Sequence, residues 1–517
     1  MLQRLLAIIV GIFLMSSINS SSAANILAIF PTPSISHQVV FRAITDELEN
    51  RGHTLTIVST DPERLGRRHP NTTEIDMHFT YEFYKREFNF VKVKEAKLDE
   101  LGMIDSWYPL IEPMYSEQFE HPEIQKLIQS RGKVKYDAVI VEFMFFYPWY
   151  AMAEWFDAPL IGMTSFDTFT ENHESFGNFA NPIAHPEIYF PFIENLTFKQ
   201  RYLSLRYYFW YNYYYTPKFQ KIVEKLINRY LPGTTTSLVE LRNKAELLMT
   251  NTHPALGFIR PIVPTTIQLG FLHIKPPKPI TDLTIRNYLD NSDKPIIYMS
   301  LGSNVRSSEV NQKFVNIFLN VFKFLPYNIL WKWETDDMKN KPNNVFIHKW
   351  LPQADLLAHP NIKLFIMQGG QQSLEEAIDR GIPLIVIPFL GDQSANAQRV
   401  EKLKIGLHLD LHSLNEKILK ETIDEVISGD YRKNILNLRD IVHDQPMKPV
   451  DKAVWWIEYF IRHKGMEHLN YTGKNVPFYQ LYMLDFLAIT LLGSFLMFKI
   501  ISKMLKIVFS YRKNKLE

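Results

Sequence analysis

A glycine pair, Gly369 and Gly370, lies inside a block, residues 350–393, that is dense in side chains able to form hydrogen bonds. Glycine lets the backbone approach a ligand closely, and the free N–H groups at such a turn can bind an anion. Ser373 adds a hydroxyl donor shortly after the pair. Together these groups predict a site for a diphosphate.

Other side chains of the block suit the remaining parts of a nucleotide sugar. Trp350 can stack on a planar base, and Glu376 can accept hydrogen bonds from both hydroxyls of a ribose. Asp392 and Gln393 can bind the hydroxyls of a sugar beyond the phosphates. Each residue alone is more often structural, since a single tryptophan usually belongs to a core and an Asp-Gln pair to a solvated loop. Their combination favours a binding site.

These side chains require a strand, a turn, a helix and a second strand in that order. Residues 363–367 and 383–387 are short apolar runs with β-branched content, and residues 372–380 between them have a helical pattern. This arrangement predicts two parallel strands joined by a crossover helix. The glycine pair then lies where the first strand meets the helix N-terminus, which favours anion binding.

The block resembles the donor-binding signature of the UDP-glycosyltransferases, which move a sugar from a UDP-sugar to a small acceptor. The residues that match in order are Trp350, Pro352, Gln353, His359, Pro360, Gly369, Gly370, Ser373, Glu376, Ala377, Gly381, Pro383, Pro388, Asp392 and Gln393. Further matches outside the block are Ser300-Leu301-Gly302-Ser303, His37 and Arg51-Gly52-His53. The resemblance covers nearly the whole chain and looks closest to the insect branch of the family.

One position departs from the family pattern. The glycine pair usually follows Thr-His, and the histidine ring is understood to donate a hydrogen bond to the diphosphate. Here the two preceding residues are Met367 and Gln368. A glutamine amide can still donate, but it carries no charge and loses more side-chain entropy when it is ordered.

The candidate catalytic base is His37, because histidine accepts a proton readily at neutral pH. It follows the predicted strand 26–30, at the edge of the sheet where α/β sites form, and the family carries its catalytic histidine there. A carboxylate should orient the imidazole. The family pattern assigns this role to Glu142, at the end of the strand 138–141, where aspartate is commoner. Asp137, at the other end of that strand, is the alternative.

The resemblance implies a role for each matching residue. Gly370, Ser303 and Ser373 would bind the phosphates, Trp350 the base, Glu376 the ribose, and Asp392 with Gln393 the sugar, while Gln353 and Gln368 complete the donor site. It also implies displacement with inversion, UDP-glucose as the donor and a lipophilic phenol, pigment, steroid or toxin as the acceptor. No metal and no cofactor beyond the UDP-sugar are expected. A protein of the same fold that binds without turnover is the alternative, and an epimerase is a weaker one.

Length and composition limit the architecture. The chain has 517 residues, more than one core normally holds, so two α/β domains of the Rossmann type facing a cleft are expected. The predicted segments are a signal peptide 1–24, an acceptor-binding domain 25–275, a linker 276–292, a UDP-sugar-binding domain 293–450, a helical return and stem 451–478, a transmembrane helix 479–502 and a basic tail 503–517. The net charge of +2 does not suggest nucleic acid as a partner, and there is no cysteine.

Both ends of the chain carry membrane signals. Residues 1–24 have the apolar run and small-residue exit of a secretory signal, whose alternative is a buried helix. Residues 481–501 are apolar, and the basic residues after them predict a cytosolic tail and a lumenal body, with retrieval to the endoplasmic reticulum as one interpretation of the tail. Asn71, Asn195 and Asn470 begin glycosylation sequons. A homo-oligomer is left open.

The segment 202–215 contains an unusual density of aromatic residues, YLSLRYYFWYNYYY. Three interpretations fit it: a wall of a lipophilic acceptor pocket, a surface that lies on a membrane, or part of a core. The sequence does not choose among them.

Overall fold

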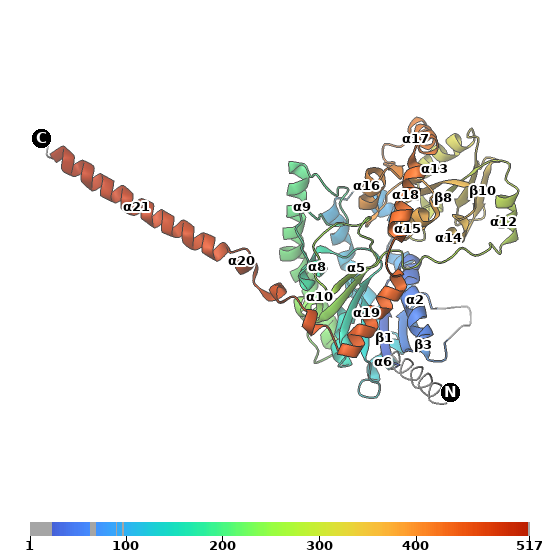
Figure 1. Ribbon diagram of the computed structural model, residues 1–517. Helices are drawn as coiled ribbons and strands as arrows, with labels where there is room; N and C mark the ends of the chain where they lie inside the picture. The colour runs from blue at the N-terminus through green and yellow to red at the C-terminus, as the bar shows by residue number, and fades with distance from the viewer. Residues whose placement is uncertain (1–22, 63–68, 89, 96–97, 515–517) are drawn as a thin grey trace, which may run out of the picture. The chain divides into compact units, whose positions relative to one another are not determined.

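The computed structural model describes residues 23–62, 69–88, 90–95 and 98–514 (Figure 1). The chain divides into two compact units between Leu469 and Asn470. The first unit contains two separate β-sheets, both entirely parallel. Most of the predicted signal peptide, residues 1–22, lies outside the described residues.

The first sheet has the strand order β3-β2-β1-β4-β5-β6-β7. Its strands are β1 (Asn25–Phe30), β2 (Thr54–Ser59), β3 (Thr72–Asp76), β4 (Ala138–Glu142), β5 (Leu160–Thr164), β6 (Ala245–Thr250) and β7 (Thr266–Gln268). The central strands β4 and β5 are buried along their whole length. Helices cover both faces of such a sheet, which explains why these strands are continuous apolar runs.

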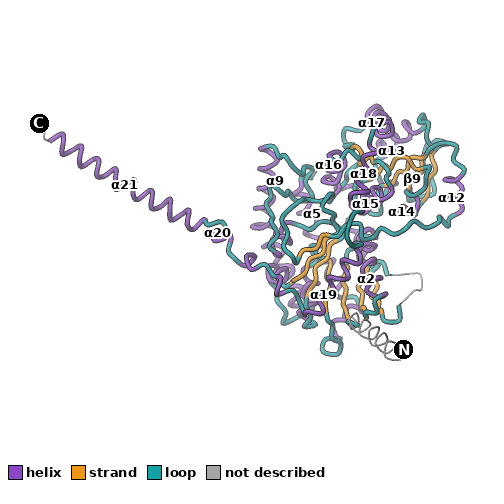
Figure 2. Tube along the Cα trace, viewed as in Figure 1, coloured by secondary structure: helices purple, strands orange, loops and turns teal. Residues whose placement is uncertain are grey.

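Two groups of helices cover the first sheet (Figure 2). On one face lie α2 (Ile35–Asn50) and α19 (Pro449–His463), and on the other lie α5 (Glu100–Glu120), α6 (Pro122–Gln129), α7 (Tyr147–Trp155), α10 (Thr216–Tyr230) and α11 (Leu238–Asn243). Shorter helices of this half are α3 (Thr80–Glu87), α4 (Phe90–Glu95) and α8 (Thr170–Phe176).

Helix α19 follows the second sheet in sequence but packs on the first. Its apolar face joins the core under α2, and Arg51 Nη2 lies 3.0 Å from Asp451 Oδ1. Arg51 Nη1 also lies 3.5 Å from Glu458 Oε2. The predicted helical return after residue 450 therefore ties the two halves of the first unit together.

The second sheet has the strand order β10-β9-β8-β11-β12-β13. Its strands are β8 (Ile296–Ser300), β9 (Asn328–Lys332), β10 (Val345–His348), β11 (Ile362–Met367), β12 (Leu384–Val386) and β13 (Gly406–His408). One face packs on α13 (Gln312–Phe322) and α17 (Glu416–Ser428), and the other on α12 (Leu283–Asp290), α14 (Gln353–Leu356), α15 (Gln371–Arg380), α16 (Gln393–Lys402) and α18 (Tyr431–His443).

The predicted linker needs one correction. Residues 283–290, inside the range 276–292, form α12, and Ile285 and Leu289 are buried in the core of the second sheet. Asp282 caps this helix by accepting hydrogen bonds from the N–H groups of Thr284 and Ile285. The segment without regular structure is therefore shorter than the proline-rich sequence suggests.

The strand order reverses once in each sheet, between β1 and β4 and between β8 and β11. At such a reversal the loops after the two strands leave in opposite directions, and a crevice opens at the carboxyl edge. His37 follows β1 and Glu142 ends β4, while Gly302 follows β8 and the glycine pair follows β11. Both reversals thus carry predicted site residues, and the predicted fold class of two Rossmann-like domains is confirmed.

The aromatic segment forms α9 (Phe198–Trp210) and a π-helical turn, η1 (Tyr211–Tyr215), which continues into α10. Thr197 and Gln200 form a capping box at its start. Tyr207 and Tyr211 lie in the core, so the core interpretation holds for one face of the segment.

The second unit contains η4 (Thr472–Asn475), α20 (Phe478–Leu481) and α21 (Leu484–Asn514). Within α21, Leu484–Tyr511 is long and apolar enough to cross a membrane. The helix predicted at 479–502 thus begins later, after Met483, whose φ of 53° interrupts the chain direction.

Candidate active site

His37 and Glu142 form a hydrogen-bonded pair at the reversal of the first sheet. His37 lies in the first turn of α2, and Glu142 is the last residue of β4, the strand beside β1. His37 Nδ1 lies 2.8 Å from Glu142 Oε1, and the Glu142 side chain is fully buried while 14% of His37 is exposed. With Nδ1 donating to the carboxylate, Nε2 is the atom left to accept a proton.

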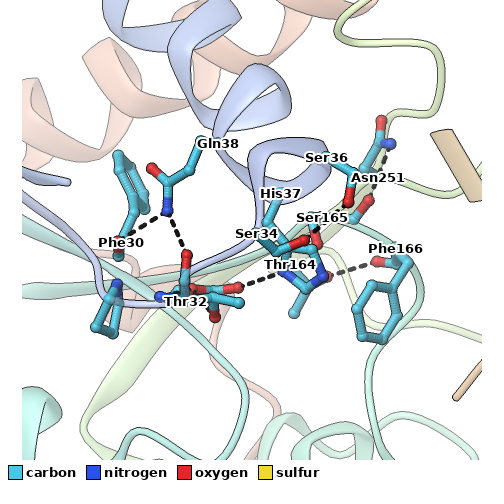
Figure 3. Close-up of polar contacts among 12 residues, drawn as sticks. Phe30, Thr32, Ser34, Ser36, His37, Gln38, Thr164, Ser165, Phe166 and Asn251 are labelled. Atoms are coloured by element: carbon cyan, nitrogen blue, oxygen red, sulfur yellow. Dashed lines mark hydrogen bonds and ion pairs between the residues drawn. The ribbon is translucent and has the colours of Figure 1, made fainter. Parts of the chain in front are cut away.

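Glu142 is itself held in place by the loop after β1. Its Oε2 accepts hydrogen bonds from Thr32 Oγ1 at 2.6 Å and from the Thr32 N–H at 3.3 Å. Gln38 Nε2 donates to the carbonyls of Phe30 and Thr32, both at 2.9 Å, and so fixes that loop (Figure 3). Thr32, two residues after the end of β1, was not predicted.

The alternative partner, Asp137, lies at the opposite edge of the sheet. Its Oδ2 accepts a hydrogen bond of 2.8 Å from the N–H of Asn25, at the start of β1. The structure therefore brings Glu142 to His37 and leaves Asp137 in a structural contact at the amino edge.

His37 opens onto a cavity of about 1250 Å³, which includes its open mouth. The imidazole meets the ring of Phe166 edge-on at 5.5 Å between centroids. Aromatic, methionine and isoleucine side chains make most of the wall, among them Trp107, Met114, Phe145, Ile188, Tyr215 and Phe219. The domain of the second sheet contributes Asn304 and residues 390–393 to the wall, so Asp392 and Gln393 border the same cavity as His37.

The glycine turns of the second sheet lie around Gln368. Gly302 (φ 80°) and Gly369 (φ 98°) adopt left-handed backbone conformations that favour glycine. A Cβ at residue 302 would overlap Gln368 Nε2, so a larger residue there would displace this amide. Within the described residues Gln368 Oε1 is buried without a hydrogen-bond partner. Gln368 therefore lies at the predicted diphosphate position, beside Gly370 at the N-terminus of α15.

Gln353 connects two other predicted donor residues. Its Nε2 donates to Ser373 Oγ at 2.8 Å and to Glu376 Oε2 at 2.7 Å, and its Oε1 accepts from the Tyr298 hydroxyl at 3.1 Å. Burial raises the pKa of Glu376 to about 7, against the opposing effect of the Gln353 hydrogen bond. Gln353 thus fixes the orientation of both the serine and the glutamate.

Trp350 is not a core residue, because 57% of it is exposed. Lys332 Nζ lies 5.7 Å from the centre of its ring and donates to the carbonyl of Gly302 at 2.9 Å. Ser303, the next residue, lies beside Asn304, with 3.5 Å from its Oγ to Asn304 Oδ1. A base stacked on Trp350 would therefore have the Gly302 turn close to it.

Asp392 is held by a network within α16. Its Oδ2 accepts from Asn396 Nδ2 at 2.7 Å and from the N–H of Gln371 at 3.2 Å. Asn396 Nδ2 also donates to the carbonyl of Gly369 at 2.8 Å, and Asn396 Oδ1 accepts from Arg399 Nη1 at 2.8 Å. Burial raises the pKa of Asp392, which Asn396 and the charges of His37 and Arg399 partly offset. Asn396, four residues after Asp392 on one helix face, was not predicted.

Gln393 uses its amide oxygen for the backbone. Oε1 accepts from the N–H groups of Phe389 at 2.7 Å and Leu390 at 3.1 Å. The amide nitrogen is the part of this side chain that remains for a sugar hydroxyl.

Direct hydrogen bonds join the two domains around the cavity. Asn304 Nδ2 donates to Ser34 Oγ at 3.1 Å, and Gln372 Nε2 donates to the Ser165 carbonyl at 2.6 Å. Asn251 Nδ2 donates to Glu375 Oε2 at 3.1 Å. It also donates to the Ser165 carbonyl at 3.1 Å, as Figure 3 shows. Both halves of the site are thus fixed relative to each other.

The remaining predicted positions lie at the surface. Asn71, Asn195 and Asn470 are all exposed. Across the residues that the structure describes, no three histidine, aspartate or glutamate side chains are grouped to hold a metal ion.

The fold matches solved structures of glycosyltransferases. A UDP-glucosyltransferase from Polygonum tinctorium has a TM-score of 0.57 at 15% identity, covering 86% of this chain and 100% of that one. The calicheamicin glycosyltransferase CalG4 has a TM-score of 0.55 at 18% identity, covering 85% and 98%. Two parallel α/β domains with the site residues at facing sheet reversals define a glycosyltransferase of the GT-B type.

A family model described as UDP-glucoronosyl and UDP-glucosyl transferase matches residues 25–515, and the chain belongs to this family. An ecdysteroid UDP-glucosyltransferase of Spodoptera littoralis nuclear polyhedrosis virus is 32% identical over 92% of this chain and 96% of the viral protein. UDP-glucosyltransferase 2 of Dactylopius coccus is 31% identical over 97% and 96% of the two chains. The protein is therefore a UDP-glycosyltransferase that transfers a sugar from a UDP-sugar to a small lipophilic acceptor.

Proposed function

We propose that the protein transfers glucose from UDP-glucose to a hydroxyl group of a neutral, polycyclic or phenolic acceptor, with inversion at the anomeric carbon. The observation that carries this proposal is the cavity that His37, paired with the buried Glu142, shares with Asp392 and Gln393. A base and a set of sugar-binding groups that border one space can act on one bond.

His37 is the general base of the proposed reaction. Its Nε2 takes the proton of the acceptor hydroxyl while the acceptor oxygen forms a bond to the anomeric carbon. The bond from that carbon to the β-phosphate oxygen breaks, and UDP leaves with the electron pair. Glu142 stabilises the imidazolium that results, and Thr32 keeps Glu142 in position.

The leaving diphosphate is proposed to lie between the glycine turns. Gly370 starts α15, whose N-terminal dipole favours negative charge, and Gln368 and Ser373 offer neutral donors beside it. Ser303 adds a hydroxyl from the other strand end. These groups stabilise the developing charge on UDP, so the proposal requires no metal and no cofactor besides the co-substrate.

The other donor contacts follow from the placement of the side chains. Trp350 stacks on the uracil, Glu376 accepts the ribose hydroxyls, and Asp392 with the amide nitrogen of Gln393 binds the transferred sugar. Glucose is supported by the viral and scale-insect relatives, whose names specify glucosyl transfer. An ecdysteroid, the acceptor class in the name of the viral relative, has the size and apolar character that this cavity accommodates.

The cellular setting is part of the proposal. The apolar run near the N-terminus of the sequence, the candidate span in α21 and the basic residues after residue 502 support an endoplasmic reticulum enzyme with its first unit in the lumen. Glycosylation at the exposed sequons and a role in detoxification are consistent with that setting.

The first experiment measures UDP release from microsomes that contain the full chain, UDP-glucose and a set of phenolic and steroid acceptors. Release that needs both an acceptor and His37 supports the proposal, with His37→Ala as the matched variant. His37→Ala should keep its affinity for UDP, and a large loss of UDP binding would instead assign His37 to the donor site. Release only with UDP-glucuronic acid, UDP-galactose or UDP-N-acetylglucosamine would replace glucose as the donor.

A further inference from the structure

The segment α9–η1–α10 has an inner and an outer aromatic face. On the inner side, Tyr207 and Tyr211 belong to the core, and Tyr215 and Phe219 line the acceptor cavity. On the outer side, the rings of Phe198, Tyr202, Phe209, Tyr213 and Tyr214 are between 54% and 79% exposed. The inner face thus forms part of the core and of the cavity wall, and the proposed reaction gives the outer face no role.

The outer rings gather on one side of the helix. Phe198, Tyr202, Phe209 and Tyr213 are separated by four or seven residues, a spacing that repeats on one helical face. The Phe209 and Tyr213 rings stack with their centroids 6.1 Å apart. A run of large exposed aromatic residues is unusual on a face that meets only water, and such patches mark protein or membrane contacts.

The charge of this segment points to one of these partners. Residues 198–223 contain no aspartate or glutamate, and their basic residues are Lys199, Arg201, Arg206, Lys218 and Lys221. Helix α5 neutralises two of them, because Arg206 Nη2 lies 3.7 Å from Asp99 Oδ2 and Lys218 Nζ lies 2.8 Å from Asp105 Oδ1.

The other basic residues are available to a partner. Lys199, Arg201 and Lys221 are exposed, and within the part of the chain that the structure describes they have no ion pair. A surface with exposed rings and unneutralised cations is complementary to a layer that is apolar below and anionic at its surface.

We propose that the outer face of α9 and η1 lies on the surface of a lipid bilayer, with its aromatic rings at the level of the headgroups. Tyrosine favours this depth, because its ring is apolar and its hydroxyl can remain in water, and phenylalanine is typical of the apolar face of helices that lie on a membrane. Each basic residue near an anionic surface adds about 1 kcal/mol of attraction. The chain also contains a candidate membrane-spanning segment, Leu484–Tyr511, which would attach the rest of the protein to a bilayer.

This membrane contact is independent of the proposed function, but it would affect how acceptors reach the cavity. Tyr215 and Phe219 line the acceptor cavity from the same helical segment that carries Tyr213 and Tyr214 outside. The wall between the cavity and the proposed lipid surface is thus one helix thick. Acceptors that dissolve in the bilayer would be concentrated beside the cavity.

The absence of cysteine from the chain makes a direct test simple. The full-length protein carrying Tyr213→Cys, labelled with an environment-sensitive fluorophore, is reconstituted in nanodiscs of phosphatidylcholine and phosphatidylserine with headgroup-level nitroxide lipids. Phe324→Cys is the matched control, since Phe324 is 79% exposed but lies after α13, on the second domain. We expect the label at residue 213 to be quenched at least about twofold more than the label at 324.

Two results would overturn the proposal. Equal quenching at 213 and 324 would leave the outer face in water. A blue-shifted emission at 213 without lipid quenching, increasing with the protein-to-lipid ratio, would show that a second copy of the chain covers it. A second variant, Lys199→Glu with Arg201→Glu, should lower the quenching at 213 in anionic discs and leave it unchanged in discs of phosphatidylcholine alone. No effect of this variant in anionic discs would remove the electrostatic part of the proposal.

Discussion

The replacement Glu142→Gln tests the proposed catalytic pair most directly. Glu142 now accepts hydrogen bonds on both oxygens, from His37 Nδ1 at 2.8 Å and from Thr32 at 2.6 and 3.3 Å. A glutamine has one accepting oxygen and one donating nitrogen. Because the Thr32 N–H can only donate, the amide oxygen must face Thr32, and the NH₂ group then faces His37.

This amide orientation reverses the protonation of the imidazole. Nδ1 must accept from the glutamine, so the proton of neutral His37 moves to Nε2, the atom that should take the acceptor's proton. Loss of a positioned general base lowers the rate by about 10²- to 10⁴-fold, equivalent to roughly 3 to 5 kcal/mol in the activation free energy. Since Glu142 lies outside the donor site, the KM for UDP-glucose should stay within about twofold.

The assay is UDP release under saturating donor and acceptor, beside UDP binding by calorimetry. Glu142→Asp is the matched control, because it keeps the charge and shortens the side chain by one methylene group, and it should retain more activity than Glu142→Gln. Thr32→Val should lose activity too, by about tenfold, the equivalent of one hydrogen bond. If Glu142→Gln kept wild-type kcat, or if its loss appeared only in the KM for UDP-glucose, the pair would have no catalytic role.

Three further outcomes are expected from the donor site. Gln368→His should raise the affinity for UDP about three- to tenfold at pH 6 and less at pH 8, because only the imidazolium form adds a charge to the hydrogen bond. Calorimetry at both pH values measures this affinity, and no change would place the side chain away from the diphosphate. Burial raises the pKa of Glu376 to about 7, so its carboxyl group becomes negatively charged as the pH rises through this value. The KM for UDP-glucose should therefore decrease as the pH increases, and Glu376→Gln should abolish that dependence. Asn396→Ala removes the hydrogen bonds to Asp392 and to the Gly369 carbonyl. It should raise the KM for UDP-glucose about tenfold or more, while the affinity for UDP alone changes less. Fully additive losses in a double variant with Asp392→Asn would contradict the network.

The central strands of both sheets could be predicted from the sequence, and the edges could not. β1, β4, β11 and β12 were predicted within one residue at each end, because burial on both faces makes them short apolar runs. All four edge strands, β3, β7, β10 and β13, were missed. Edge strands have one neighbour and some exposed residues, as the sequence TTEID of β3 illustrates, so they lack the apolar run.

β6 was missed for a different reason. Its sequence, AELLMT, consists mostly of residues that favour a helix, yet pairing with β5 and β7 makes it a strand. Tertiary contacts override local propensity here, and a single sequence does not contain them.

The candidate site residues were easier to predict than the side chains that hold them in position. His37, Glu142, Asp392 and Gln393 were placed by strand ends and by the family pattern; the structure brings His37, Asp392 and Gln393 to one cavity and places Glu142 against His37. Thr32 and Asn396 position Glu142 and Asp392, but threonine and asparagine are common after strands and on helices, so their types carried no signal. For the aromatic segment, the core and pocket interpretations are both confirmed, because a helix presents different residues to different neighbours.

Neither domain holds a complete site. The proposed base, His37, lies at the reversal of the first sheet, and the proposed sugar-binding pair belongs to the second domain, so the distance between them depends on how the domains are joined. Polar contacts make that junction around the cavity: Ser34 with Asn304, and Gln372 with the Ser165 carbonyl. Apolar contacts add to it, since Leu256 and Phe271 of the first domain lie in the core of the second sheet, whereas each hydrogen bond is directional and contributes only about 1 kcal/mol. We expect such a junction to set the geometry of the closed cleft and to allow the opening that UDP release requires.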